Sequence, residues 1–246
     1  MTITVITCTY NAATVLAGTL ASVREQSYDD VEHVIVDGAS SDDTMAMVEQ
    51  YRQSEHRHGI VVVSEKDGGL YYAMNKGIGL ATGKYLVFLN AGDKLYGPDT
   101  LKQLAAKTAD GKYGVIYGDT ELVDDNGQSL GMRRLRPPEV LTWRSFSNGM
   151  LVCHQAFYAN TEIAKRVAYN TDYRFSADVD WCIRIMKTAE AENLSNLNTH
   201  MTLCRFLEGG MTAKNHRASL MERFNVMRRH YGLIKTIYKH ITFFFR

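Results

Sequence analysis

Polar side chains follow five strongly apolar runs in the first half of the chain, at the point where each run ends. The runs are "TITVITC", "VEHVIVD", "GIVVVSE", "KYLVFLN" and "YGVIYGD". The polar residues are Thr9, Tyr10 and Asn11 after the first run, Asp37 after the second, Glu65 and Asp67 after the third, Asn90 and Asp93 after the fourth, and Asp119 after the fifth. Carboxylate and amide oxygens can accept hydrogen bonds from a nucleoside and can hold a hard divalent cation.

The runs predict buried strands, because they are rich in β-branched residues and nearly continuous in apolar character. Helical patterns lie between them, at 13–26, after "SSDDT", at 70–81 and at 98–109. This alternation predicts an α/β fold with a doubly wound, mainly parallel sheet flanked by helices. Ligands of such sheets bind outside the carboxyl ends of the strands. One acid there could simply cap a helix, but five polar strand ends together favour a shared site.

Two common phosphate-binding motifs are missing from the sequence. No GxGxxG follows the first strand, and GxxxxGK[ST] occurs nowhere, which counts against the usual dinucleotide and P-loop sites. A nucleotide at this edge would be held by acids that accept hydrogen bonds from the base or ribose, and a cation would offset its diphosphate charge. We therefore expect a nucleotide-sugar site.

The remaining sequence favours one globular, cytoplasmic protein. The 246 residues are 45% hydrophobic and 22% charged, which is close to the average of globular domains. Helical patterns recur at 161–167, 178–188 and 215–231, with extended pieces within 120–160 and 193–207. The four separated cysteines predict reduced thiols. The first residues lack the basic region of a signal peptide, and no apolar run is long enough to span a bilayer.

Five strings in this order and spacing carry a resemblance to a known family. They are "VITCTYNA", "VIVDGASSDDT", "SEKDGGLYYAMNKGI", "GKYLVFLNAGD" and "FSADVDWCIRI". The chain resembles the inverting family 2 glycosyltransferases of the GT-A fold, and in particular the small bacterial enzymes of colanic acid and other exopolysaccharide pathways. The resemblance is dense over residues 2–95 and thinner over 150–215. It implies sugar transfer from a nucleotide-diphosphate sugar, UDP- or GDP-linked, to a saccharide acceptor in surface polysaccharide synthesis.

The resemblance implies a nucleotide-binding role for the first three strand ends. Thr9, Tyr10 and Asn11 would border the nucleobase, and Asp37 and Asp67 would accept hydrogen bonds from it. The glycines after Asp67 would let the chain turn beside the nucleotide.

Beyond that turn, Asn75 and Lys76 on the following helix are expected to reach the donor, with a solvated Lys76 as the alternative. Asn90 is expected at the donor as well. The family's metal-binding acids normally follow the fourth strand, where this chain has "NAGD". Asp93 alone remains as an acid, and with an Asn oxygen, diphosphate oxygens and water it could hold Mn²⁺ or Mg²⁺.

The catalytic base is expected in "SADVDW", at Asp178. One carboxylate on the acceptor side must deprotonate the attacking hydroxyl, and a helix start would favour its ionised form. His154 and Gln155 of "CHQAF", together with Asp180, are candidates for the acceptor site. The stretch "EGGMTAKNH" resembles a loop that closes over the diphosphate, and its His216 is a candidate metal ligand or a helix-cap residue.

The C-terminal end is strongly basic. Residues 211–246 contain eight Lys or Arg and one acid, Glu222, a local charge of +7, whereas the whole chain carries +1. The aromatic, basic tail predicts either an amphipathic helix at the inner face of the cytoplasmic membrane or a packed helix or oligomer contact. A lipid-linked acceptor would explain membrane proximity. Nucleic acid is not expected, because the charge is terminal and no recognised binding fold accompanies it.

We expect a GT-A domain over 1–215, with a nucleotide-binding half (1–119) and an acceptor half (120–215), and a helical extension over 216–246. Two other functions fit parts of the pattern. A catalytically silent nucleotide-sugar-binding protein would explain the eroded acid motifs. A sugar nucleotidyltransferase shares the α/β scaffold, but the glycine-rich basic loop that it needs after the first strand is missing.

Overall fold

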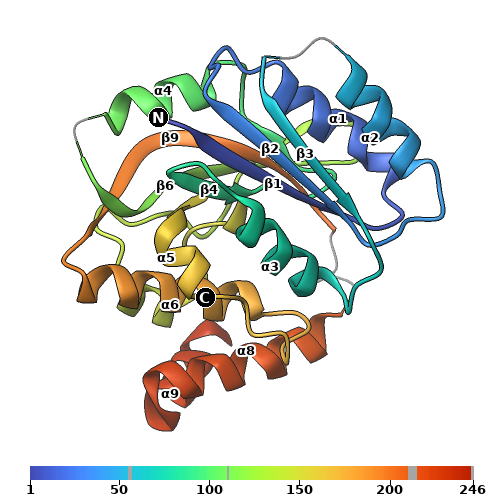
Figure 1. The fold of residues 1–246 in the computed structure, drawn as a ribbon. Coiled ribbons are helices and arrows are strands. Elements are labelled where there is room, and N and C mark those ends of the chain that lie inside the picture. Colours follow the sequence, from blue (N-terminus) through green and yellow to red (C-terminus); the bar gives the residue numbers. More distant parts are fainter. Residues whose placement is uncertain (55–56, 110, 210–214, 245–246) are drawn as a thin grey trace.

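The computed structural model describes residues 1–54, 57–109, 111–209 and 215–244, and it shows a central mixed sheet between layers of helices (Figure 1). The strands are β1 (Ile3–Thr9), β2 (Val31–Asp37), β3 (Gly59–Ser64), β4 (Tyr85–Phe88), β5 (Lys94–Leu95), β6 (Tyr113–Val123), β7 (Ser129–Met132), β8 (Phe157–Asn160) and β9 (Ser195–Leu207). The helices are α1 (Ala13–Arg24), α2 (Thr44–Gln53), α3 (Leu70–Leu80), α4 (Thr100–Lys107), α5 (Thr161–Arg166), α6 (Ala177–Ala191), α8 (His216–Tyr231) and α9 (Leu233–Phe244), with short 3₁₀ helices η1 (Trp143–Asn148) and η2 (His154–Ala156).

The sheet has the order β3-β2-β1-β4-β8-β6-β9-β5, and β7 pairs with β6. The first four strands are parallel, as predicted. The fifth predicted strand, β6, is not the next neighbour of β4, because the short strand β8 lies between them and runs antiparallel to both. β6 also continues to Val123, so Asp119 lies within the strand and not at its end. There Asp119 forms a two-pronged ion pair with Arg136, and it does not belong to the strand-end cluster that the sequence predicted.

Side chains of β2 alternate between two buried layers, which explains why the run is apolar throughout. Ile35 packs with Leu16 of α1 and Val48 of α2 on one face. Val34 and Val36 belong to the other, larger cluster. Successive side chains of a strand point to opposite faces, so a sheet covered on both sides needs apolar residues at every position.

On that second face, α3 contributes the buried side chains of Met74 and Ile78. The four cysteines are all buried and unpaired with one another. The helical patterns predicted at 161–167 and 178–188 correspond to α5 and α6, and the extended piece near 193–207 forms the single long strand β9.

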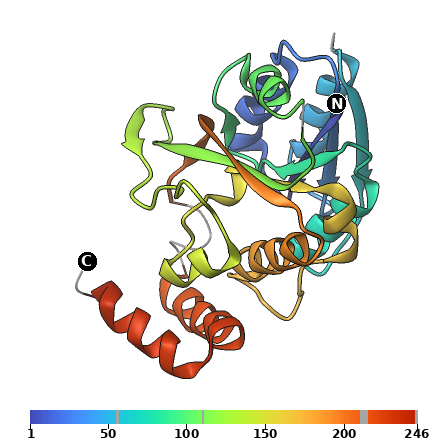
Figure 2. The same cartoon turned by 90° about the vertical axis from the view of Figure 1, so that its left-hand side faces the viewer.

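The C-terminal helices α8 and α9 lie below α6 in Figure 1, and Figure 2 shows the same placement from the side. Gly232 separates them with a φ of 82°, a left-handed conformation that favours glycine. α9 packs one side on α8, where the rings of His240 and Phe224 meet at 5.0 Å. Its other side exposes apolar residues, with Ile234 at 86% and Tyr238 at 62%. Within the described ranges, no helix has the length and apolar character that crossing a membrane requires.

Candidate active site

Asp37, at the end of β2, is a fully engaged carboxylate. It is buried. Its oxygens accept hydrogen bonds from the hydroxyls of Thr9, Ser40 and Ser64 and from the backbone N–H of Ser40. Burial raises its pKa, but these hydrogen bonds outweigh burial and lower the pKa overall. A carboxylate offers about four acceptor positions, so the protein itself fills them, and Asp37 braces this edge of the sheet.

Tyr10 and Asp67 form an open wall beside Asp37. The Tyr10 ring is 68% exposed. Both side chains approach Gly38, since a Cβ placed there would lie 3.3 Å from Cδ2 of Tyr10 and 3.5 Å from Oδ2 of Asp67. Oδ1 of Asp67 accepts the backbone N–H of Gly69 at 2.8 Å, which leaves Oδ2 for a ligand. An aromatic face next to an accepting carboxylate can stack on a base and bind its edge.

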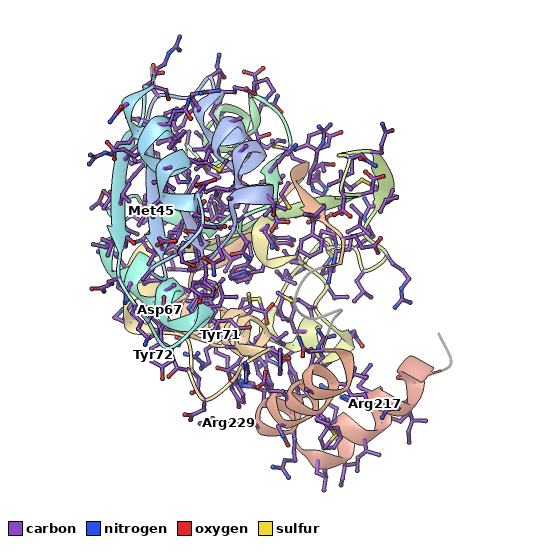
Figure 3. All side chains as sticks on the ribbon, turned by 90° about the vertical axis from the view of Figure 1, so that its right-hand side faces the viewer. Met45, Asp67, Tyr71, Tyr72, Arg217 and Arg229 are labelled. Atoms are coloured by element: carbon purple, nitrogen blue, oxygen red, sulfur yellow. The ribbon has the colours of Figure 1, made fainter. Side chains whose placement is uncertain are left out.

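The turn after Asp67 has the form that its glycines predicted. Gly69 has a φ of 126°, and a Cβ on Gly68 would lie 2.7 Å from the ring of Tyr72. Figure 3 shows Asp67, Tyr71 and Tyr72 close together where α3 begins. The turn therefore places Asp67 of the open wall next to the first turn of α3.

The other predicted donor residues make contacts within the protein. Asn11, with a φ of 48°, accepts the backbone N–H of Ser41. Asn75 pairs with the backbone of Tyr169 through both its amide oxygen and its nitrogen. Nζ of Lys76 lies 2.9 Å from a carboxylate oxygen of Glu65. These contacts hold the loops around the wall, and direct donor contacts of these residues stay predictions.

The turn from Asn90 to Asp93 is buried beneath this edge. The hydroxyl of Thr19 accepts the N–H of Gly92 and donates to the carbonyl of Asp93. The carboxylate of Asp93 accepts the side-chain N–H of Gln155 at 2.6 Å and the backbone N–H of Leu207 at 3.0 Å. Burial raises the pKa of Asp93 to about 8.

One side-chain oxygen of this turn is open to a divalent cation. The side-chain oxygen of Asn90 is buried and has no hydrogen-bond partner among the described residues, so it is free to become a ligand. The described residues contain no group of three or more His, Cys, Asp or Glu that could hold a metal. Asn90 and Asp93 would therefore supply two oxygens, and phosphate oxygens and water would have to complete the shell.

Asp178 stands in the first turn of α6 and is partly exposed. Burial raises its pKa, against opposing effects of the Arg223 charge and the Val179 backbone N–H. Backbone N–H groups at the helix start favour the ionised form, as the sequence led us to expect, but desolvation outweighs them and the net shift of the pKa is upward. A raised pKa suits a general base, since proton transfer is most effective when the pKa lies nearer the working pH.

Tyr71 links the open wall of Tyr10 and Asp67 to Asp178. It follows Asp67 by four residues and is 8% exposed. Burial and the Asp178 carboxylate raise the pKa of Tyr71, and the backbone N–H groups of Asp178 and Ala177 lower it. The start of α3 therefore contacts the start of α6, and Asp67 and Asp178 belong to the same region.

The predicted acceptor residues are mostly buried. His154 stacks on Phe88 at 5.0 Å and hydrogen-bonds Tyr169, and burial lowers its pKa to about 3, so the ring is neutral. Gln155 is 4% exposed and binds Asp93. These positions favour packing roles over direct contact with an acceptor.

Asp180, expected at the acceptor site, is instead engaged by side chains of α6 and α8. Its carboxylate accepts from Arg184 at 2.6 Å and lies 2.7 Å from Nε2 of His230 on α8, and burial, which raises the pKa, is outweighed by these contacts. Asp180 and Arg184 also line a cavity of about 250 Å³ with Arg229. The predicted phosphate-covering loop falls largely on 210–214, outside the described residues, and the side chain of His216 is also outside them.

Comparison with known proteins identifies the family. A profile described as Glycosyl transferase family 2 matches residues 4–167, more than half of the chain. The chain belongs to glycosyltransferase family 2. The predicted family and enzyme class are thus confirmed.

A similar protein agrees with this assignment, and solved structures confirm the predicted GT-A fold. The chain is 35% identical over 181 residues to a PGL/p-HBAD biosynthesis glycosyltransferase of Mycobacterium bovis, covering 72% of this chain and 66% of that protein. Staphylococcus aureus TarS residues 1–349 with UDP-GlcNAc superpose with a TM-score of 0.73 at 19% identity, covering 93% of this chain and 65% of TarS. The mannosyltransferase PcManGT of Pyrobaculum calidifontis with GDP-Man and Mn²⁺ gives 0.64 at 20% identity, covering 98% and 64%. The chain spans about two thirds of the length of each.

Several residues of this family 2 site escaped the sequence analysis. Gly38 lies inside "VIVDGASSDDT", and its closeness to Tyr10 depends on two separate loops. Glu222 and Arg223 lie on α8, outside the predicted catalytic boundary at 215. The sequence does single out Glu222, because it is the one acid among the last 36 residues, eight of which are basic.

Proposed function

We propose that this glycosyltransferase moves a sugar, with inversion, from a nucleotide-diphosphate donor to a saccharide acceptor, and that Asp178 is its general base. The observation that carries the proposal is the partly exposed Asp178, whose pKa is raised, beside Tyr71 and the open wall of Tyr10 and Asp67. Asp178 would take the proton of the acceptor hydroxyl. The hydroxyl oxygen then bonds to the anomeric carbon from the face opposite the nucleotide, and the bond to the diphosphate oxygen breaks.

The proposed donor site places the nucleobase against the Tyr10 ring with its edge toward Oδ2 of Asp67. Thr9, Asn11 and Asp37 hold the surrounding loops. TarS binds UDP-GlcNAc and PcManGT binds GDP-Man, which supports a UDP- or GDP-linked sugar here.

A divalent cation, Mn²⁺ or Mg²⁺, is proposed at Asn90 and Asp93. The unpartnered oxygen of Asn90 supports this site, as does the Mn²⁺ in the PcManGT complex. When bound, the cation would supply positive charge to the leaving diphosphate. Binding of UDP or GDP measured by calorimetry in Mn²⁺ and in EDTA checks the proposal, and equal affinities in the two conditions would contradict it.

The acceptor is proposed to be a lipid-linked saccharide of a surface polysaccharide pathway, reached at the cytoplasmic face of the membrane. The exposed apolar side of α9 supports membrane contact, because Ile234 and Tyr238 project from a helix that also carries Lys235 and Lys239. Apolar burial and attraction to anionic lipid both favour binding of such a helix at a bilayer surface.

Asp178→Asn tests the catalytic proposal directly. The variant removes the base but keeps size and shape, so kcat for donor hydrolysis or transfer should fall by about 10²-fold or more, with nucleotide affinity unchanged. Asp172→Asn, an exposed acid six residues earlier, is the matched control and should behave like the wild type. Nucleotide binding without any turnover by the wild type would instead favour a silent binding protein, and pyrophosphate release would favour a nucleotidyltransferase.

A further inference from the structure

Helix α8 holds the segment that leads into α6 by one carboxylate. Oε1 of Glu222 accepts the backbone N–H of Arg174, and Oε2 accepts those of Phe175 and Ser176, all at 2.6 Å. The hydroxyl of Ser176 also donates to the carbonyl of Ser219, at 3.3 Å. Ser176 is the residue directly before α6, so a side chain from a different helix binds the backbone at its start.

This contact lies directly before a helix start that has no side-chain cap. The N-cap residue Ser176 makes no side-chain capping hydrogen bond of its own, although the first N–H groups of a helix need partners. Glu222 supplies negative charge and acceptors at that end, where the helix dipole favours them. Asp178 is two residues beyond Ser176, so the position of its carboxylate depends on this clamp.

Arg223, the next residue of α8, provides a charge opposite to that of Asp178. Its guanidinium is the strongest positive influence on the Asp178 carboxyl, ahead of Arg133. Nε of Arg223 is buried and no described residue accepts its hydrogen bond, while the residue as a whole is partly exposed. The other ionisable groups that influence or sense Asp178 are Tyr71 on α3, Tyr169 in the loop after α5, and Cys182 on α6.

We propose that α8 is part of the active site: Glu222 positions Asp178 by clamping the backbone at 174–176, and Arg223, the next residue of α8, supplies a positive charge to the same region. The inference rests on the proposed role of Asp178 as the base. It moves the functional boundary of the enzyme past 215, because the helix that was expected to begin a separate extension supplies two residues to the site.

The charge of Arg223 affects the pH dependence of the rate in a direction that can be predicted. A general base works only when it has lost its proton, so activity falls as the pH drops through its pKa. Burial raises that pKa, and a neighbouring positive charge offsets the rise. Removing the charge of Arg223 therefore raises the pKa of Asp178 further and moves the acidic limb of the rate profile to higher pH.

The pH profile of kcat/KM for Arg223→Gln is the decisive measurement. We expect its acidic limb to shift to higher pH by about one unit, the lower end of the shift that a close opposite charge causes. At a fixed pH on that limb, kcat/KM should then be about tenfold lower than in the wild type. Arg223→Lys keeps the charge and should keep most of the wild-type profile. Arg217→Gln removes an exposed charge from the same helix and is the matched control. A limb unmoved in Arg223→Gln overturns the electrostatic part of the proposal.

Glu222→Gln tests the clamp separately. Its amide retains one oxygen but replaces the other with a donor that faces backbone N–H groups, so at least one of the three hydrogen bonds is lost. We expect kcat to fall at least tenfold while the affinity for the nucleotide changes less than twofold. Circular dichroism and thermal melting identify a variant that fails to fold, and Glu222→Asp, whose shorter side chain keeps the charge, then supplies the second comparison.

The outcomes separate this inference from the proposed function. If Asp178→Asn stays active, the base assignment fails whatever α8 does. If Asp178→Asn is inactive while folded Glu222→Gln and Glu222→Asp keep wild-type kcat, only the clamp is wrong.

Discussion

The proposed role of Asp67 in the open wall predicts how much nucleotide affinity is lost in Asp67→Asn. In Asp67→Asn, the amide oxygen can still accept the N–H of Gly69, which the carboxylate holds at 2.8 Å. The amide nitrogen then replaces Oδ2, the oxygen left for a ligand. A base N–H that met an acceptor now meets a donor, and binding should weaken although the turn survives.

The magnitude follows from one lost hydrogen bond to a charged group. Such a bond contributes about 1.5 to 3 kcal/mol, and about 1.4 kcal/mol corresponds to a tenfold change in affinity. The Kd for UDP or GDP should therefore rise by about 10- to 150-fold. Titration calorimetry of both nucleotides at constant pH and Mn²⁺ measures the effect, and thermal melting should show little change.

Asp124→Asn is the matched control. Asp124 also accepts backbone N–H groups within a turn, those of Asn126 and Gln128, but it lies beyond β6 and away from the wall. It should leave both Kd values unchanged. A Kd for Asp67→Asn within twofold of the wild type for both nucleotides would refute the assignment of Asp67 to the donor.

Three further perturbations have defined outcomes. Gly38→Val places methyl groups where Tyr10 and Asp67 converge, so the nucleotide affinity measured by calorimetry should fall at least tenfold. Unchanged affinity would mean that the nucleotide does not bind at the wall of Tyr10 and Asp67. Truncation after Gly232 removes α9 and should abolish salt-sensitive sedimentation with anionic vesicles while activity on a soluble acceptor remains; equal sedimentation would count against membrane contact. Between pH 7 and pH 5 the unfolding free energy of the wild type should fall, and in His154→Phe this fall should be smaller by about 2 kcal/mol. The reason is that burial lowers the folded pKa of His154 to about 3, so stability is full above the unfolded pKa of about 6.5 and falls below it. Urea melts at the two pH values measure this difference, and parallel slopes in both proteins would contradict it.

Asp37 lies where the sequence predicted and makes extensive contacts within the protein, and its hydrogen bond to a nucleobase stays a prediction. Its type and its place at a strand end suggested a ligand for the base, and the structure puts it beside the wall. The hydroxyls of Thr9, Ser40 and Ser64 then use its oxygens. Asp37→Ala should therefore lower the unfolding free energy by about 2 kcal/mol or more, because donors are left unpaired, and a thermal melt equal to that of the wild type would contradict this bracing role.

Much of the first half could be predicted because its signals are local. An unbroken apolar run marks a strand covered on both faces, and the polar residue that ends it marks the carboxyl edge. β1 to β4 and the strand ends at Thr9 and Asp37 follow from this pattern. The insertion of β8 between β4 and β6 does not, because a four-residue strand gives little signal and its partners lie far away in the sequence.

The sequence by itself determined the family, the parallel arrangement of β1 to β4 and the position of Asp178 at the start of a helix. Only the tertiary structure decided which of the polar residues are free to bind a ligand. Tyr10 is exposed and Asp67 is partly exposed, while His154 and Gln155 are buried. Only packing brought Glu222 to the backbone of 174–176, across 46 to 48 residues of chain. Hydrogen bonds and burial of this kind depend on which elements meet in space, and residue types along one chain do not specify those meetings.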